Sequence, residues 1–191
     1  MVKSPDPRIA RLFSRSQVEA LLDLDSVIAA VEEGFRRLGA GAPPPSGVLG
    51  LHPAGGGFHV KAAIFPGGET GRLYLAAKLN ANFPGNPAQH GLPTIQGLVG
   101  LFDATDGVPL AVLDSTAITI LRTAAATAVA VKHLARPEAT KLAIIGCGAQ
   151  ARAQVLAVNR VRSLSRVLVS DIDHAVAERF AAEMSAALSI P

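Results

Sequence analysis

The first regular pattern along the chain is helical. Four apolar residues recur at i, i+4, i+8 and i+11, namely Val27, Val31, Phe35 and Leu38. This spacing predicts an amphipathic helix with one apolar face, and Asp25 or Ser26 is expected to cap its start. A shorter helix that runs through Leu22 is predicted before it, because Ser16 and Glu19 have capping-box spacing.

Gly39 is expected to end the amphipathic helix, and beyond the connector 39–47 the pattern becomes strand-like between glycine-rich turns. Five strands are predicted, at Gly47–His52, Gly57–Ile64, Leu73–Leu79, Ile95–Phe102 and Pro109–Asp114. The stretch Asn80–Thr94 is crowded with Asn, Gly and Pro, which predicts a loop. The alanine-rich, nearly uncharged run Ser115–Ala135 predicts a helix that is buried on most sides.

The pattern changes at Pro137, which disfavours helix in the residue before it. A strand (141–145), a helix (150–161), a strand (166–170) and a helix (173–187) follow in order. Such a βαβα series is typical of the start of a parallel doubly wound sheet. The sequence therefore predicts an α/β fold with two domains: a mixed α/β domain over residues 1–136, and the first βαβα part of a Rossmann domain over residues 137–191.

The segment Gly146-x-Gly148-x-x-Ala151 joins the first predicted strand of this series to its helix. Gly146 permits a tight turn, Gly148 lets a pyrophosphate approach the backbone amides, and the small Ala151 lets the helix pack closely on the strand. The helix N-terminus then presents N–H groups and a positive dipole end to phosphate. The order of elements predicts a dinucleotide site; the alternative is a tight βα turn that binds no nucleotide.

The second strand of the series ends at Asp171, 20 residues after Ala151. In dinucleotide-binding domains, an acid about 20 residues after the glycine motif accepts a hydrogen bond from a ribose 2′-hydroxyl. A carboxylate repels a 2′-phosphate, and the next residue is Ile172 and not Arg, so the sequence favours NAD over NADP. Asp173 is the competing acid, although its position suits a cap for the following helix.

Composition narrows the classes of partner. The chain has no Trp and one Tyr, which argues against a stacking platform for single-stranded nucleic acid. Its net charge is +3 with the basic residues scattered, which favours a small anionic ligand. The single Cys147 fits a reducing compartment, and no signal-peptide pattern is visible. The uncharged run Leu79–Phe102 contains prolines, which argues against a membrane span. We expect a cytoplasmic protein.

Three cations lie within apolar segments: Lys61, Lys78 and Arg122. A cation in such surroundings needs an anionic partner, because burying it alone is costly. The three are therefore candidates to converge on a substrate carboxylate, with Arg122 binding it in a bidentate manner. The alternative is that each reaches solvent or pairs with a local acid such as Asp103 or Asp114.

Two histidines are candidate acid–base groups, His59 and His90, although a structural role is the alternative for each. His59 alternates with Lys61 and so shares its strand face. The five His and the one Cys have no spacing typical of a metal site, so no metal is predicted.

Several segments together resemble a known family. They are KLNANFPGN (78–86), GLPTIQG (91–97), LAVLD (110–114), LRTAAATA (121–128) and GCGAQA (146–151), in this order and spacing. On these residues the chain resembles the ornithine cyclodeaminase/mu-crystallin family over roughly residues 15–190. The family also includes an NAD-dependent alanine dehydrogenase and ketimine reductases.

The resemblance implies a homodimer in which residues 1–136 bind the substrate and form the dimer, beside an NAD-binding Rossmann domain. It implies that Lys78 and Arg122 contact the carboxylate of a small amino acid and that Thr94 lies near it. The family usually carries an Arg on an early strand as a further carboxylate ligand, and Lys61 is interpreted as its replacement.

The resemblance also implies that Thr123, Ala149 and Gln150 contact the cofactor. The activity it implies first is the NAD-dependent conversion of ornithine to proline with release of ammonia. The alternatives are an NAD(P)-dependent amino- or imino-acid dehydrogenase or ketimine reductase, similar to alanine dehydrogenase, and a crystallin-like protein that binds the nucleotide without turnover.

Family members are typically longer than 191 residues. An aspartate that acts as acid and base near the substrate is expected beyond Pro191, together with the remaining strands of the Rossmann sheet. The chain is therefore expected to be the N-terminal part of a family member, catalytically inactive by itself. A βαβα piece is also expected to leave a strand edge unpaired and its sheet half covered.

Overall fold

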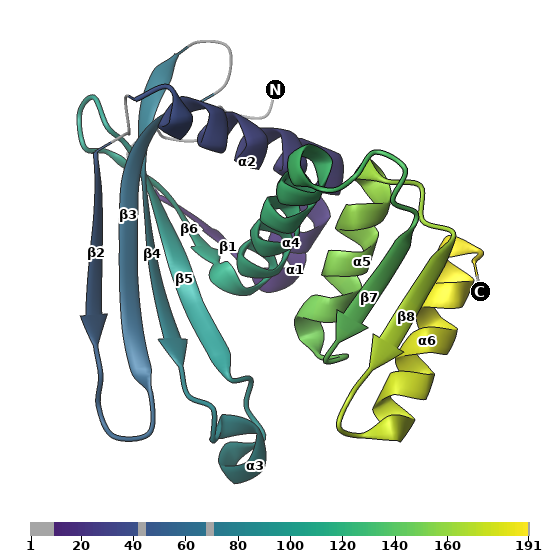
Figure 1. The fold of residues 1–191 in the computed structure, drawn as a ribbon. Helices are drawn as coiled ribbons and strands as arrows, with labels where there is room; N and C mark the ends of the chain where they lie inside the picture. Colours follow the sequence, from purple (N-terminus) through teal and green to yellow (C-terminus); the bar gives the residue numbers. More distant parts are fainter. Residues whose placement is uncertain (1–9, 42–44, 68–70, 191) are drawn as a thin grey trace, which may run out of the picture. The chain divides into compact units, whose positions relative to one another are not determined.

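The computed structural model describes residues 10–41, 45–67 and 71–190. The chain divides into two compact units, one formed by residues 1–21 and 38–118 and the other by residues 22–37 and 119–191. Figure 1 shows the strands and helices of each unit.

The first unit is built on a six-stranded sheet with the order β1-β6-β5-β4-β3-β2. Its elements are β1 (Arg11–Phe13), α1 (Arg15–Leu21), β2 (Ser46–Leu51), β3 (Gly57–Gly67), β4 (Arg72–Asn82), α3 (Asn86–His90), β5 (Ile95–Asp103) and β6 (Pro109–Asp114). Strands β2 to β6 are antiparallel neighbours, which confirms the five predicted strands. β1 was not predicted; it adds to the sheet edge parallel to β6.

A buried carboxylate fixes the turn between β5 and β6. Asp103 is only 2% exposed, and it accepts hydrogen bonds from the guanidinium of Arg72 and from the backbone N–H of Thr105 at 2.8 Å. The Thr105 N–H and then Arg72 hold the pKa of Asp103 below its usual range. The ends of β4 and β5 are thereby tied together.

The predicted caps of the first two helices were wrong by two or three residues. The capping box of α1 is formed by Ser14 and Gln17, not by Ser16 and Glu19: the Ser14 N–H donates to Gln17 Oε1 at 2.9 Å and the Gln17 N–H donates to Ser14 Oγ at 3.4 Å. Helix α2 (Leu24–Gly39) begins after Asp23, whose carboxylate accepts from the Ser26 N–H at 2.9 Å. The side chain that reaches the free amides decides where each helix begins.

The stretch 80–94 was predicted to be a loop, but part of it forms regular secondary structure. β4 continues to Asn82, which is paired with Ile95 of β5, and α3 then makes a short helix that ends at Gly91 with φ +64°. Pairing on both sides extends β4 through residues whose composition favours a loop, because each added ladder pair satisfies backbone groups.

The second unit contains most of α2 and most of α4 (Ser115–Leu134), followed by β7 (Lys141–Ile145), α5 (Ala149–Val161), β8 (Arg166–Ser170) and α6 (His174–Leu188). β7 and β8 are parallel neighbours, and the predicted βαβα order is confirmed. α5 and α6 cover one sheet face through Leu142, Ile144, Val167 and Val169. On the other face Ile145 is 90% and Leu168 56% exposed, so the sheet is half covered.

Small residues pack α4 between its neighbours in this unit. Ala124, Ala125 and Ala128 are fully buried, and they form one cluster with Ile28 of α2 and Ala157 of α5. Alanine lets helix backbones approach closely, which is why α2 and α4 group with the βαβα series. The boundaries of the compact units therefore differ from the predicted domain boundary at residue 136. That residues 1–136 bind the substrate and residues 137–191 bind NAD stays a prediction.

α4 is long and apolar enough to cross a membrane, but its buried alanines belong to the helix cluster of the second unit.

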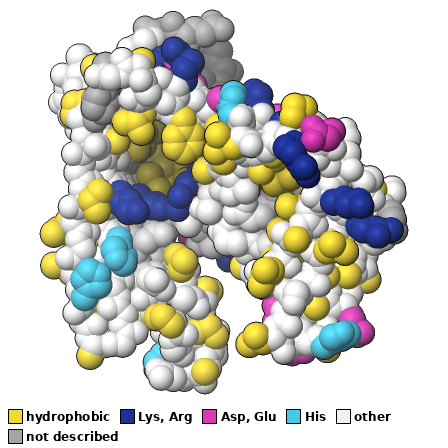
Figure 2. All heavy atoms as spheres, in the orientation of Figure 1, with side chains coloured by type: hydrophobic (Ala, Val, Ile, Leu, Met, Phe, Trp, Pro, Cys, Tyr) yellow, Lys and Arg dark blue, Asp and Glu magenta, His cyan; other side chains and the backbone are white. Residues whose placement is uncertain are grey.

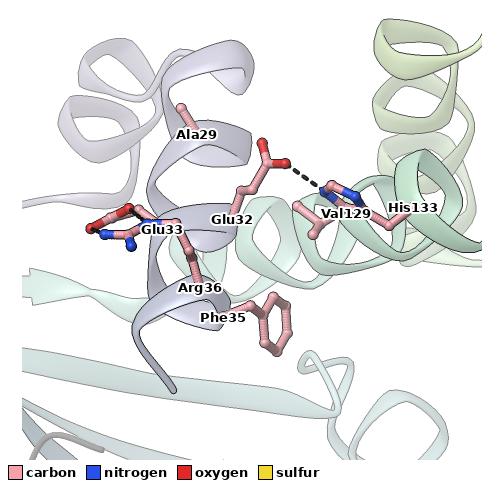
Figure 3. A pocket seen from close by; sticks show the side chains of 7 residues that line it. All are labelled: Ala29, Glu32, Glu33, Phe35, Arg36, Val129 and His133. Carbon is pink, nitrogen blue, oxygen red and sulfur yellow. Dashed lines mark hydrogen bonds and ion pairs between the residues drawn. The ribbon is translucent and has the colours of Figure 1, made fainter. Parts of the chain in front are cut away.

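An ion-pair cluster also joins α2 to α4 (Figure 3). The Glu32 carboxylate accepts from Lys132 Nζ at 2.8 Å and lies 2.6 Å from His133 Nε2. Lys132 and then His133 lower the pKa of Glu32. The hollow that Figure 3 shows beside this cluster is lined by residues of α2 and α4. None of these lining residues belongs to the glycine turn.

Candidate functional site

The glycine turn has the backbone geometry that the sequence predicts. Gly146 follows β7 with φ +89°, a left-handed conformation that side chains disfavour. Its N–H donates to Ser170 O of β8 at 2.8 Å, so the turn is anchored to the neighbouring strand. Gly148 is the extended N-cap of α5, and no side chain caps the amides there. The first turn of α5 therefore begins with uncapped N–H groups, which suit an anion.

The outer side of the turn is open. A Cβ placed on Gly146 or Gly148 would meet no heavy atom of the described residues within 4 Å. An open hollow of about 420 Å³ is lined there by Ile145, Gly146, Ser170, Asp171 and Ile172. Gln150 Oε1 in the first turn of α5 is buried and has no hydrogen-bond partner among the described residues. Ala151 is buried at the third motif position. These features fit a bound dinucleotide.

The Asp171 carboxylate is turned back toward the glycine turn. Its Oδ2 accepts from the Cys147 N–H at 2.7 Å and its Oδ1 accepts from the Asp173 N–H at 3.0 Å. The Cys147 and Asp173 amides lower the pKa of Asp171, so it is ionised at neutral pH. Asp173 is the N-cap of α6, where it accepts from the Ala175 N–H at 2.9 Å. This confirms the predicted cap.

Cys147 behaves as a turn residue. It is buried, and burial, followed by the charge of Asp171, raises the pKa of its thiol. A thiol whose pKa is raised is a poor nucleophile at neutral pH.

The sheet brings two of the predicted site residues together. Lys61 of β3 is directly opposite Lys78 of β4, and His59 is opposite Asn80. Side chains two residues apart share a face, so all four lie on one face of the sheet. Figure 2 shows Lys, Arg and His side chains on both units, including the unit built on the six-stranded sheet. Like charges directly opposite each other destabilise a sheet, and an anion bound between the two side chains would reduce that repulsion.

Asp103 and Asp114, the two acids considered as alternative partners for the lysines, each make contacts with other groups as well. Asp103 is held by Arg72. Asp114 is paired with Leu98, which places it on the face opposite Lys78, and it accepts from the Thr116 N–H at 2.8 Å.

The remaining predicted residues belong to other elements. Thr94 precedes β5, five residues before Val99, the partner of Lys78. Arg122 is exposed on α4, in the second unit. Thr123 follows it, and its hydroxyl donates to Thr119 O of the same helix at 2.7 Å. Within residues 10–41, 45–67 and 71–190, no three His, Cys, Asp or Glu side chains are grouped as metal ligands.

One polar contact on the lysine face was missed. Ser115, fully buried at the start of α4, donates to Asn80 Oδ1 at 2.8 Å. Asn80 was interpreted as part of a loop. Its spacing of two residues from Lys78 is the signal that would have placed it on the same strand face.

A mixed sheet, followed by a βαβα series with a glycine turn after its first strand, places the chain among the α/β proteins of the dinucleotide-binding type. The chain belongs to the ornithine cyclodeaminase/mu-crystallin family: the sequence model of that family matches residues 10–190.

Relatives with known activities and structures share the fold. The L-lysine cyclodeaminase of Streptomyces rapamycinicus is 39% identical over 85% of this chain and 47% of its own length. A solved archaeal alanine dehydrogenase dimer with bound NAD has a TM-score of 0.86 and 34% identity, over 95% of this chain and 54% of its own.

The Δ(1)-pyrroline-2-carboxylate reductase of Thermococcus litoralis, solved with NADH and L-proline, has a TM-score of 0.82 and 36% identity, over 94% of this chain and 55% of its own. The chain spans about half the length of the curated relatives it matches.

Proposed function

We propose that the protein is an NAD-dependent enzyme that acts on a small amino or imino acid. The observation that carries this proposal is that Lys61 lies directly opposite Lys78 on one face of the sheet. The same chain has a glycine turn whose helix amides are not capped by a side chain and whose Cys147 N–H is bound by Asp171. The first feature suits a carboxylate, and the second suits a dinucleotide.

The cofactor would be held by the turn and the strand that follows. The amides around Gly146, Gly148, Ala149 and Gln150 would bind the pyrophosphate, with Ala151 allowing close packing. Asp171 keeps lone pairs beyond its two backbone contacts, and these would accept from the ribose hydroxyls. Its charge would disfavour a 2′-phosphate, which supports NAD. Thr123 is proposed as a further contact.

The substrate would be held by its carboxylate. Lys61 and Lys78 would bind it from the sheet and Arg122 from α4, with Thr94 near the amino acid. Fixing the carboxylate fixes the direction of the Cα–H bond. When bound, the nicotinamide supplies a hydride acceptor for that carbon. The chain's own contribution is to bind and orient the acid and to exclude water around it.

The specific reaction we propose is the conversion of ornithine to proline. Oxidation at Cα gives an imine, the terminal amine adds to it, ammonia leaves, and the resulting cyclic imine is reduced, so that no net NADH forms. The similarity to a lysine cyclodeaminase supports this reaction.

The second candidate is a dehydrogenase or imine reductase with net turnover of the cofactor. The similarity to an alanine dehydrogenase and to a pyrroline-2-carboxylate reductase favours it equally.

One assay separates these candidates. The full-length protein is incubated with L-ornithine and a catalytic amount of NAD⁺, then with L-alanine and excess NAD⁺, while proline, ammonia and absorbance of NADH are followed. Proline and ammonia without accumulation of NADH support cyclodeamination. NADH formed with alanine supports the dehydrogenase. Binding of NAD⁺ without turnover of any amino or imino acid would contradict both.

We also propose a homodimer in the cytoplasm, without nucleic-acid or membrane partners. Every residue of the edge strand β2 is exposed in the single chain, including Val48, Leu49 and Leu51, and an exposed apolar edge favours self-association. The lone cysteine supports a reducing compartment.

A further inference from the structure

Two histidines pack against each other at one end of the lysine face, the sheet face that carries Lys61. The rings of His52 and His59 meet edge to face, with their centroids 5.3 Å apart. His59 lies two residues before Lys61 on β3, so the two side chains share this face. The proposed function gives neither histidine a role.

Two glycines make room for the imidazole rings. A Cβ at Gly50, the residue opposite His59, would lie 2.9 Å from His52 Cε1. A Cβ at Gly57 would lie 3.0 Å from His52 Cδ2 and 3.4 Å from His59 Cε1. Side chains at these positions would displace the His52 ring, so β2 and β3 together are shaped to hold both histidines.

The lysine face carries an excess of positive charge. Over the described parts of β2 to β6, Asp103 is the only acid on this face, and it is held by Arg72 and by the Thr105 N–H. Lys61 is exposed and forms no ion pair with a described residue. The charge of Lys61 and the N–H donors of the two histidines are therefore open to an anion.

The chemistry of the cluster favours a carboxylate over an ammonium group. An imidazole has an N–H donor whether it is neutral or protonated, and a lysine ammonium has donors only. An ionised carboxylate has acceptors only, and its hydrogen bonds to such donors are strengthened by charge. The terminal ammonium of ornithine would find no acid in this cluster, and the charge of Lys61 would repel it.

The cluster lies next to the position that the proposed function gives to the first carboxylate of the substrate. His59 and Lys61 are two residues apart, a step of about 7 Å along the strand. A second acid group on a short side chain would therefore come within reach of the histidines while the first is bound at Lys61.

We propose that His52, His59 and Lys61 bind a second carboxylate, on the side chain of the substrate, and that the protein acts on a short dicarboxylic amino or imino acid. The inference rests on the proposed function, within which it favours the dehydrogenase or imine reductase over the cyclodeaminase. In the oxidation, Cα passes a hydride to NAD⁺ and the neutral amino group loses a proton, which gives the imine. Both carboxylates stay unchanged, so the cluster selects the side chain and takes no part in the redox step.

Matched substrates test the inference in the full-length protein. L-aspartate and L-asparagine differ only at the end of the side chain, which is a carboxylate in the first and an uncharged carboxamide in the second. With excess NAD⁺ and absorbance of NADH as the readout, we expect kcat/KM for L-aspartate to exceed the values for L-asparagine, L-alanine and L-ornithine at least about tenfold. Equal values for L-aspartate and L-asparagine would overturn the inference.

His59→Phe keeps an aromatic ring against His52 and removes the N–H donor. The ratio of kcat/KM for L-aspartate to that for L-alanine should fall at least about tenfold, whereas a purely structural role would lower both values alike. His52→Phe should have the same effect, and it replaces the first variant if that one melts at a lower temperature. His174→Phe changes an exposed histidine of α6 and is the matched control, in which the ratio should remain that of the wild type.

An unchanged ratio in both His59→Phe and His52→Phe would overturn the inference. Turnover of L-ornithine or L-alanine without turnover of L-aspartate would overturn this inference alone and leave the proposed function standing. Binding of NAD⁺ without turnover of any amino or imino acid would overturn the proposed function, and this inference with it.

Discussion

The Oδ2 atom of Asp171 accepts a hydrogen bond from the Cys147 N–H at 2.7 Å. This contact joins the end of β8 to the glycine turn after β7, and the Gly146 N–H to Ser170 O bond lies beside it. The acid that we propose for the ribose therefore also fixes the shape of the turn. Loss of its side chain should affect both the pyrophosphate and the ribose contacts.

Asp171→Ala should weaken NAD⁺ binding about tenfold or more, because hydrogen bonds to a charged group are lost and the turn is released. It should also reduce the preference for NAD⁺ over NADP⁺, which titration with both nucleotides measures. Asp173→Ala is the control: it removes a helix cap, at about 1 kcal/mol in stability, and should leave nucleotide binding near the wild-type value. Equal losses in both variants would contradict the assignment to Asp171.

Arg122→Met should raise the KM of the amino acid at least about tenfold in the full-length protein, because a bidentate partner of the carboxylate is removed. The affinity for NAD⁺ should change little. Arg179→Met removes an exposed arginine of α6 and serves as the charge-matched control. An unchanged Michaelis constant for Arg122→Met would remove this residue from the site.

Ala125→Leu should lower the free energy of unfolding by about 1–3 kcal/mol, since the fully buried Ala125 leaves no room for a larger side chain. Ala130→Leu, on the exposed side of the same helix, should be nearly neutral. Denaturant titration of both variants checks the difference. Equal stability of the two would show that α4 is not closely packed in the second unit.

The ion pairs of α2 predict a dependence on pH. Arg36 and then Arg37 lower the pKa of Glu33 to about 2. Because the folded-state pKa is lower than the ordinary value of 4.5, these pairs stabilise the fold above about pH 4.5 and lose that effect as pH falls toward 2. The difference in melting temperature between the wild type and Glu33→Gln should therefore be small, since the pairs are exposed, and should shrink as pH falls from 4.5 toward 2. A constant difference would contradict the pairing.

Local signals predicted the second unit well and the site only in part. The boundaries of β7 and β8 follow from short apolar runs and from glycines whose effect is local. Asn82 and the strand β1 could not be predicted in this way, because long-range pairing determines them. Residues 80–94 have a loop-like composition, yet the ladder with β5 extends the strand as far as Asn82.

The site shows the same limit. The alternation of His59 and Lys61 could be derived from the sequence, and so could the acid at Asp171. The register that places Lys61 opposite Lys78 depends on how β3 and β4 align, and the contact of Ser115 with Asn80 joins residues 35 positions apart. Neither relationship leaves a local signal.

The central claim is that cations from this chain hold an amino acid's carboxylate beside a nicotinamide that is bound at the glycine turn. A crystal structure of the full-length protein with NADH and L-proline tests it most directly. We predict the carboxylate within hydrogen-bonding distance of Lys78 Nζ and the Arg122 guanidinium, and the pyrophosphate on the amides around Gly148. A carboxylate bound elsewhere, with both cations in solvent, would contradict the account.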